Sequence, residues 1–272
     1  MRLLQTKLNK PPIHTTYIER EKIKEQLTDY DLYKMLLVSA PAGSGKSTVI
    51  NAWLDTIDTG YSWFSLDASD NDIQQFLAYL IAGLERVETF KSYQLSELIS
   101  SFQSVGADSL IHSIINVLYE SQLPFTIVLD DYHLIQNQDI HKIIMMLIEH
   151  LPHHANLVII TREDPPLSLS KLRVSRQLLE IRNKELQFDS NETTQFMSKA
   201  MGLKMESTHI ESLNRKTEGW IAGLQLAALS LQNKHNPKEL IEEFTGNHYI
   251  ADYLLEEVLS HMDQESINFL LA

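Results

Sequence analysis

Continuous apolar runs bounded by polar residues recur along the first two thirds of the chain. They lie at residues 34–40, 61–67, 125–131, 156–162 and, more weakly, 178–182. Runs of this kind are typical of strands that are buried on both faces of a sheet. Between them, apolar residues repeat at helical spacing at 73–81, 110–118 and 140–148. Strands that alternate with helices predict an α/β fold with a mostly parallel sheet.

The pattern changes near residue 189, after which only helical repeats occur. They cover residues 192–200, 209–216, 220–231 and 250–259. At the other end, Pro11 and Pro12 predict an extended arm over residues 1–16, and a short amphipathic helix follows at 20–27. We therefore predict three parts: an arm with its helix at 1–33, an α/β domain at 34–188 and an all-helical domain at 189–272.

The first apolar run leads directly into the sequence APAGSGKST at residues 40–48. It matches the phosphate-binding pattern G-x-x-x-x-G-K-[ST], except that Ala40 stands at the first glycine position. The glycines permit a tight path on which backbone N–H groups face a phosphate, and a methyl group at Ala40 is tolerated if φ stays negative. Lys46 would reach the outer phosphates, and Ser47 would bind Mg²⁺. The predicted nucleotide-contacting residues of the loop are Ala42, Gly43, Ser44, Gly45, Lys46, Ser47 and Thr48.

Two later runs end in charged residues that belong at the same edge of a parallel sheet. The run FTIVLDD ends in Asp130 and Asp131, and the run NLVIITR ends in Arg162. We predict that Asp130 holds Mg²⁺, directly or through water, and that Asp131 orients or activates the attacking water. Arg162 is predicted to sense the γ-phosphate. The alternative for Arg162 is a surface residue that pairs with the acidic residues after it.

Composition limits the possible partners and the location. The 272-residue chain has a net charge of −13, which disfavours nucleic-acid binding by its own surface. It contains no cysteine, so disulfides and cysteine-ligated metals are excluded. No apolar run is long enough to span a membrane and no signal peptide is recognisable, so we expect a cytoplasmic protein without a membrane partner. The uncapped apolar ending, INFLLA, indicates a fragment of a longer protein.

Several stretches together resemble the MalT-like transcriptional regulators of LuxR type, which belong to the signal-transduction ATPases with numerous domains (STAND). They are SAPAGSGKST, VLDDYHLI, ITREDPPL, LRVSRQLLEIRNKELQF and EGWIAGLQLAALS, in this order over essentially the whole chain. The resemblance implies a P-loop NTPase of the ASCE class. Its five-stranded parallel sheet would have an extra strand between the loop strand and the acidic strand. A helical domain would follow, and the chain would end before a winged-helix domain.

The resemblance also implies the ligands and the mode of action. ATP or ADP with Mg²⁺ would bind, and the segment around Tyr17, Ile18 and Arg20 would border the adenine. ADP would hold a resting form, and ATP with an inducer would favour a form that self-associates and activates transcription. Slow hydrolysis would reset the switch. The small-molecule inducer and DNA would bind through domains absent from this chain.

One feature of such regulators is missing from this sequence. Nucleotide-binding members commonly carry a proline near the start of the helix that follows EGW, at 218–220, and this proline touches the nucleotide. This chain has no proline between Pro166 and Pro237. A contact between the helical domain and the nucleotide is therefore the weakest part of the analogy.

Other functions fit parts of the same pattern. An AAA-type P-loop motor ATPase shares the strand alternation and the acidic pair. A small-molecule or nucleoside kinase would need a lid with several arginines, for which Arg173, Arg176 and Arg182 are available. An inert scaffold would keep a degenerate loop without using it. The nucleotide-dependent switch remains the first hypothesis, because it accounts for the loop, the acidic pair, the arginine and the helical domain together.

Overall fold

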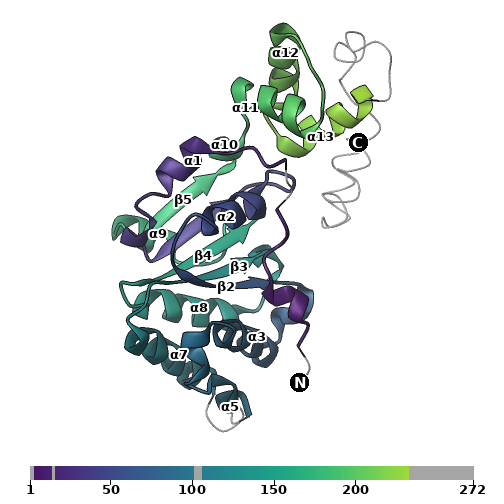
Figure 1. Ribbon diagram of the computed structural model, residues 1–272. Helices are drawn as coiled ribbons and strands as arrows, with labels where there is room; N and C mark the ends of the chain where they lie inside the picture. The colour runs from purple at the N-terminus through teal and green to yellow at the C-terminus, as the bar shows by residue number, and fades with distance from the viewer. Residues whose placement is uncertain (1–2, 14–15, 101–105, 233–272) are drawn as a thin grey trace, which may run out of the picture. The chain divides into compact units, whose positions relative to one another are not determined.

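The computed structural model describes residues 3–13, 16–100 and 106–232 (Figure 1). In this part of the chain, five strands form one sheet in the order β2-β3-β4-β1-β5, and all neighbouring strands are parallel. The predicted fold class is confirmed, and β4 is the extra strand between the loop strand β1 and the acidic strand β3. The strands are β1 (Met35–Ser39), β2 (Gly60–Ser65), β3 (Phe125–Asp130), β4 (Ala155–Thr161) and β5 (Leu178–Arg182).

Helices cover both faces of this sheet. On one side lie α3 (Ile73–Glu85), α7 (Ala107–Ser121) and α8 (Gln138–His150), and on the other lies α2 (Lys46–Leu54) (Figure 1). No helix within the described ranges is long and apolar enough to cross a membrane. The short helices are α1 (Glu21–Gln26), α4 (Glu88–Lys91), α5 (Leu95–Ser100), α9 (Leu169–Val174) and the 3₁₀ turns η2 (Tyr30–Leu32), η3 (Ala68–Asn71) and η4 (Tyr132–Leu134).

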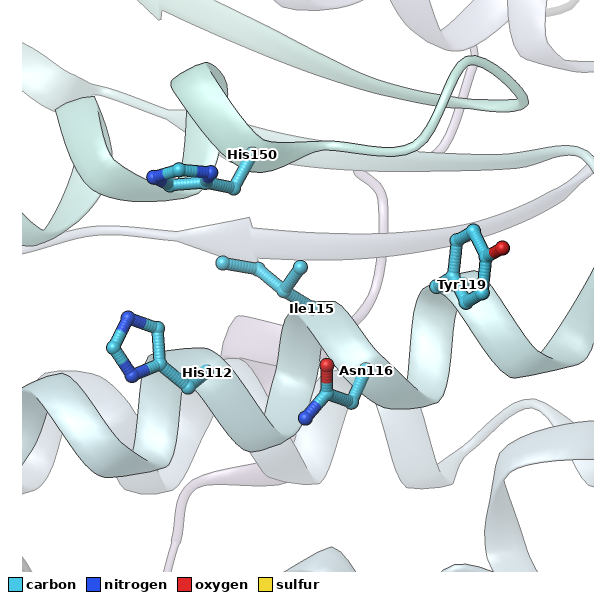
Figure 2. Close-up of a pocket in the computed structure, with 5 residues that line it drawn as sticks. All are labelled: His112, Ile115, Asn116, Tyr119 and His150. Atoms are coloured by element: carbon cyan, nitrogen blue, oxygen red, sulfur yellow. The ribbon is translucent and has the colours of Figure 1, made fainter.

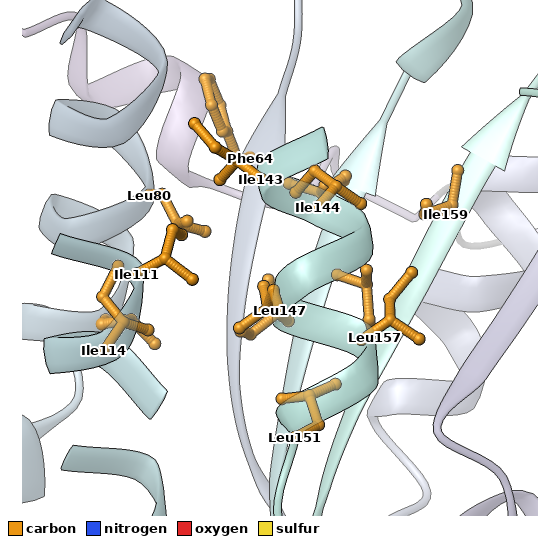
Figure 3. Packing of buried hydrophobic residues seen from close by; sticks show 14 of the residues in the cluster. Phe64, Leu80, Ile111, Ile114, Ile143, Ile144, Leu147, Leu151, Leu157 and Ile159 are labelled. Atoms are coloured by element: carbon orange, nitrogen blue, oxygen red, sulfur yellow. The ribbon is translucent and has the colours of Figure 1, made fainter. Parts of the chain in front are cut away.

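The packing explains why the strand segments read as uninterrupted apolar runs. Every residue of β1, β3 and β4 is buried, whereas the edge strands β2 and β5 are partly exposed. Leu157 and Ile159 of β4 share one buried cluster with Ile144 and Leu147 of α8, as Figure 3 shows. Because helices cover both faces, the central strands are mostly apolar, although the hydroxyl of Thr126 in β3 is buried without a hydrogen-bond partner.

The N-terminal arm differs from the prediction of an extended chain. Residues Gln5–Leu8 form a 3₁₀ turn, η1. Lys7 in this turn is buried, and its ammonium lies 2.7 Å from Asp67 and 2.6 Å from Asp70, two carboxylates at the start of η3. The prolines at 11 and 12 restrict only themselves and the residue before them, so the earlier residues were free to form a turn.

The residues after β5 form a helical bundle with its own core. It consists of α10 (Asn183–Leu186), α11 (Ser190–Gln195), the π-helical turn η5 (Phe196–Ala200), α12 (Ser207–Thr217) and α13 (Ile221–Gln232). Met197, Leu213 and Leu224 are buried in this core. Asp189 and Glu192 form a capping box at the start of α11. The helix predicted at 250–259 lies outside the described residues.

The chain divides into two compact units that do not follow chain order. Among the described residues, the first, here called the sheet unit, contains residues 3–13, 21–40 and 46–182. The second, here called the helical unit, contains residues 16–20, 41–45 and 183–232. Two short segments from before α2 therefore belong with the C-terminal helices. The domain boundaries predicted from the sequence, after residues 33 and 188, stay predictions.

Candidate functional site

Charged and hydroxyl side chains gather at the carboxyl ends of β1, β3 and β4 in the sheet unit. Ser47, in the first turn of α2, donates its hydroxyl to Asp130 Oδ1 at 2.8 Å. The backbone N–H of Asp131 donates to the same carboxylate oxygen at 3.0 Å. Asp130, Asp131 and Arg162 all act electrostatically on Lys46. The structure thus brings Lys46 and Ser47 of the loop together with the three charged residues predicted at the two strand ends.

Lys46 is a buried cation held by its own loop. Its side chain is almost inaccessible, at 8% exposure for the residue, and Nζ donates to the carbonyl of Ala40 at 2.8 Å. Burial lowers the pKa of Lys46 from 10.5 to about 8, and the nearby Arg162 adds to this, while Asp131 and Asp130 act in the opposite direction. A desolvated ammonium of this kind favours an anionic ligand, which restores the lost stabilisation of its charge.

Asp130 shows the complementary effect. Burial raises the pKa of Asp130 from 3.8 to about 6, and the charge of Asp131 adds to this, while the hydrogen bonds from Ser47 and from the Asp131 N–H oppose it. A carboxylate beside a hydroxyl is a hard-oxygen pair that suits Mg²⁺. No group of three or more His, Cys, Asp or Glu side chains that could hold a metal ion occurs among the residues described.

Asp131 occupies an unusual backbone conformation. Its φ is 59°, in the left-handed region, where aspartate is better tolerated than most residues. The turn directly follows β3 and leads into η4. Residues held in sparsely populated conformations cluster at functional sites. The left-handed backbone of Asp131 is therefore consistent with a functional role for the turn at the end of β3.

The loop segment 41–45 belongs to the helical unit and contacts the start of α13. The indole Nε1 of Trp220 donates to the carbonyl of Ala42 at 2.9 Å. The backbone N–H of Ala222 donates to the carbonyl of Gly43 at 3.1 Å. Neither contact is predicted by the sequence, in which the only local signal is the EGW stretch at 218–220.

Side chains complete the packing of this loop segment. Gly45 has φ 78°, and a Cβ atom there would lie 2.8 Å from Cδ1 of Ile221. The backbone conformation therefore favours glycine at this position, whereas Cδ1 of Ile221 lies at the end of a flexible side chain that could shift. The hydroxyl of Ser44 faces Asn183 Oδ1 at 3.4 Å. The loop segment is therefore contacted by residues that are distant in sequence, at 183 and 220–222.

The segment predicted to border the adenine also lies in the helical unit. Ile18 is buried in the core of the helical bundle. Arg20, 5% exposed, donates from Nε to Glu192 at 2.9 Å, and its guanidinium lies 4.8 Å from the centre of the Phe188 ring. Its Nη1 donates to the carbonyl of Leu186, and its Nη2 donates to the carbonyls of Glu185 and Gln187.

Arg20 therefore anchors the segment to the helical bundle through most of its donor groups. Burial raises the pKa of the neighbouring Tyr17 phenol from 10.0 to about 12. A phenol with this pKa is neutral at physiological pH, so its ring offers an uncharged surface. The adenine-side roles of Tyr17, Ile18 and Arg20 stay predictions.

Two of the three arginines considered for a kinase lid, Arg173 and Arg182, pair with carboxylates of the sheet unit. Arg173 donates from Nε to Glu180 at 2.8 Å, and Arg182 pairs with both Asp164 and Glu180. The hydrogen bond from Arg173 and the pairing with Arg182 lower the pKa of Glu180 to about 2. Arg173 and Arg182 thus form a compensated ion-pair network at β5, which argues against their use as phosphate-binding lid residues.

An open depression elsewhere on the sheet unit is lined by residues of α7 and the end of α8. Figure 2 shows its lining residues, which are His112, Ile115, Asn116, Tyr119 and His150. None of the predicted site residues contributes to it. Tyr119 is 64% exposed, so the depression is an open surface feature. It adds nothing to the chemistry at the carboxyl edge of the sheet.

Solved structures identify the class of fold. A STAND protein with a tetratricopeptide-repeat sensor from Pyrococcus horikoshii superposes with a TM-score of 0.60 at 15% identity, over 86% of this chain and 33% of that one. The Walker-type ATPase of Pyrococcus abyssi superposes with a TM-score of 0.60 at 12% identity, over 93% and 77% of the two chains. The protein therefore has the fold of the STAND-type P-loop ATPases.

Sequence comparison shows which proteins this chain is similar to over its length. The chain is 34% identical over 273 residues to the HTH-type transcriptional regulator MalT of Klebsiella pneumoniae and to that of Serratia proteamaculans, in each case over 99% of this chain. It is 33% identical to MalT of Vibrio campbellii over 98% of its length. No family model matches the chain. The chain is MalT-like over this region, which confirms the predicted resemblance, and it spans 30% of the length of these relatives.

Proposed function

We propose that the chain is the nucleotide-binding switch module of a signal-responsive transcriptional regulator. The observation that carries the proposal is the cluster at the carboxyl edge of the sheet. There Ser47 donates a hydrogen bond to Asp130, and the buried Lys46 lies within the electrostatic influence of Arg162. The STAND-type fold and the likeness to regulators named MalT support a regulatory ATPase module.

Each residue of this cluster has a separate proposed role in binding Mg²⁺ and a nucleotide. Lys46 would bind the β- and γ-phosphates, and its burial makes the interaction stronger than in water. Ser47 and Asp130 would hold Mg²⁺, which neutralises phosphate charge when it is bound. Asp131 would orient the attacking water. Arg162 would donate to the γ-phosphate, a contact that ADP cannot offer.

The last contact is what makes a switch possible. A ligand shifts an equilibrium between two conformations only through a difference in its affinity for them. The γ-phosphate distinguishes ATP from ADP, so a contact with Arg162 in one conformation would favour that conformation. We propose that the ATP form self-associates and that slow hydrolysis returns it to the ADP form. The inducer and DNA would act through other parts of the longer regulator.

Titration of the purified chain, freed of any nucleotide that co-purifies, with MgADP and MgATP, followed by calorimetry, tests the proposal. We expect both nucleotides to bind, and Lys46→Ala to weaken binding about 100-fold, because this lysine is the main positive charge offered to the phosphates. Lys142→Ala removes an exposed lysine of α8 and serves as the matched control, with no expected effect. Binding that survives Lys46→Ala unchanged would support an inert scaffold instead.

The same preparation separates the switch from an AAA-type motor. A switch is expected to turn ATP over slowly and to retain ADP through purification. A hexameric ring that forms with ATP, together with rapid steady-state turnover, would favour the motor. Size-exclusion chromatography with each nucleotide and a phosphate-release assay provide the two measurements.

A further inference from the structure

We propose that the start of α13 positions the phosphate-binding loop by holding its backbone carbonyls, with Trp220 as the principal positioning residue. This inference rests on the proposed nucleotide binding and deepens it. It assigns a role to the helical unit that does not require any of its C-terminal helices to touch the nucleotide. It therefore needs no proline near residue 220.

The geometry of the peptide unit links these carbonyls to phosphate binding. A trans peptide is planar, so the carbonyl of one residue and the N–H of the next point in opposite directions. The Trp220 indole fixes the carbonyl of Ala42 and thereby aims the N–H of Gly43 away from α13. The N–H of Ala222 fixes the carbonyl of Gly43 and aims the N–H of Ser44 in the same manner.

These two N–H groups belong to the part of the loop that cradles phosphate in the P-loop pattern. A glycine-rich loop is flexible, and ordering it on binding carries an entropic cost. Two hydrogen bonds on its outer side reduce that cost because they order the loop beforehand. Ile221, packed against Gly45, restricts the same segment by contact.

The start of a helix is well suited to this task. The first N–H groups of a helix have no partner within the helix. Ala222 is the second residue of α13, and it directs its N–H to the loop. Gly219, just before the helix, accepts a hydrogen bond from the N–H of Phe188 at 2.8 Å, which holds the entry to α13. The contact is thus part of the fold of the helical unit.

The arrangement couples phosphate binding to α13. A phosphate that accepts from the loop N–H groups polarises the same peptide units and strengthens the hydrogen bonds to their carbonyls. By linkage, whatever stabilises the start of α13 against the loop must also strengthen phosphate binding. The helical unit would thus respond to an occupied loop through the hydrogen bonds from Trp220 and Ala222.

Trp220→Phe tests the role of the indole, because it removes one N–H donor and keeps an aromatic ring. We expect the affinity for MgADP to fall about fivefold, which corresponds to the loss of one neutral hydrogen bond. Binding of adenosine, which has no phosphate, should not change. Trp63→Phe is the matched control, because its indole donates to Ser65 Oγ at 2.9 Å on β2, and MgADP affinity should remain at the wild-type value.

A spectroscopic measurement on the wild-type chain supplements the variants. The chain has three tryptophans, so a ¹⁵N–¹H correlation spectrum contains three indole signals, and loss of one in Trp220→Phe assigns it. MgADP should move the Trp220 indole signal downfield and slow its exchange with water. Adenosine should leave it in place.

A second variant removes the other donor. Ala222→Pro deletes the N–H in the first turn of α13, where proline is tolerated, and should also weaken MgADP binding about fivefold. If the wild-type chain binds MgADP while both variants bind it equally well and the indole signal does not move, the inference is wrong and the proposed function stands. If the wild-type chain binds no nucleotide, both are wrong. If a variant has a lowered melting temperature, its loss of affinity could come from partial unfolding. The response of the wild-type Trp220 indole signal to MgADP then tests the inference.

Discussion

Lys46 and Asp130 carry opposite charges at one buried edge of the sheet, and burial shifts both pKa values toward the neutral forms. The pKa of Lys46 falls to about 8 and that of Asp130 rises to about 6. Each charged form is therefore less stable there than in water. A magnesium nucleotide brings an anion to the lysine and a cation to the carboxylate. Binding would relieve both penalties, so the site exchanges some stability of the free protein for affinity.

Nucleotide affinity should depend on pH through Lys46. In the free protein this lysine loses its proton near pH 8, whereas bound phosphates would keep it protonated, so binding above pH 8 takes up a proton. Affinity for MgADP is therefore expected to be highest between about pH 6, where Asp130 becomes charged, and about pH 8, and to fall about 25-fold between pH 7.5 and 9.5. Calorimetry in buffers of different ionisation enthalpy measures both the affinity and the proton uptake. Constant affinity over this range, without proton uptake, would contradict the prediction.

At the scale of the element, the turn that enters α13 depends on a single glycine. Gly219 has φ 70°, and a Cβ atom there would lie 2.3 Å from the carbonyl oxygen of Phe188. Gly219→Ala is expected to lower the free energy of unfolding by roughly 3 kcal/mol, because backbone strain and a steric clash with the main chain add together. Gly202→Ala is the control, since Gly202 also has φ 70° but no atom lies within 4 Å of its Cβ position.

The control should lose only about 1 kcal/mol, the cost of the left-handed conformation alone. Urea unfolding followed by circular dichroism gives both values. Equal losses in the two variants would show that the contact with Phe188 adds nothing beyond the backbone conformation. A loss confined to Gly219→Ala would assign the whole effect to the clash.

The elements differ in how far the sequence determined them. The strands β1, β3 and β4 could be predicted because burial on both faces leaves a continuous apolar run. The short helices α4 and α10 could not, since one turn is too short to show a period. The predicted helix at 192–200 divides into α11 and the π-helical turn η5 for reasons that no local pattern reveals.

In the candidate site, too, some residues could be predicted from the sequence and some contacts could not. Lys46, Ser47 and Asp130 follow a spacing that the chemistry of phosphate and Mg²⁺ imposes, so they could be found by pattern. The contact from Trp220 to Ala42 joins residues 178 positions apart, and that from Arg20 to Glu192 joins residues 172 apart. Such contacts depend on the tertiary fold. The periodicity of a single sequence does not predict such long-range contacts.

At the scale of the whole molecule, the chain builds each compact unit from separated segments. Residues 16–20 and 41–45 belong to the same compact unit as the helices at 183–232, although they lie far from them in sequence. Arg20 holds the first of these segments through Glu192 and three carbonyl oxygens. The stability of the helical unit should therefore depend on a residue near the N-terminus. This dependence distinguishes an interleaved architecture from two domains that follow each other along the chain.

Replacing Arg20 with Met tests this dependence. The variant leaves Glu192 mostly buried without its cationic partner, so the helical unit is expected to lose about 3 kcal/mol of its free energy of unfolding. Adding Glu192→Gln removes the stranded charge but keeps an acceptor for the capping box, and should restore part of the loss. Arg215→Met, on the exposed surface of α12, is the matched control with no expected effect.

Hydrogen exchange measured by mass spectrometry should rise in peptides from 183–232 and at 41–45, while peptides from β1, β3 and β4 keep their protection. A uniform rise across all peptides would mean that the two units unfold as one.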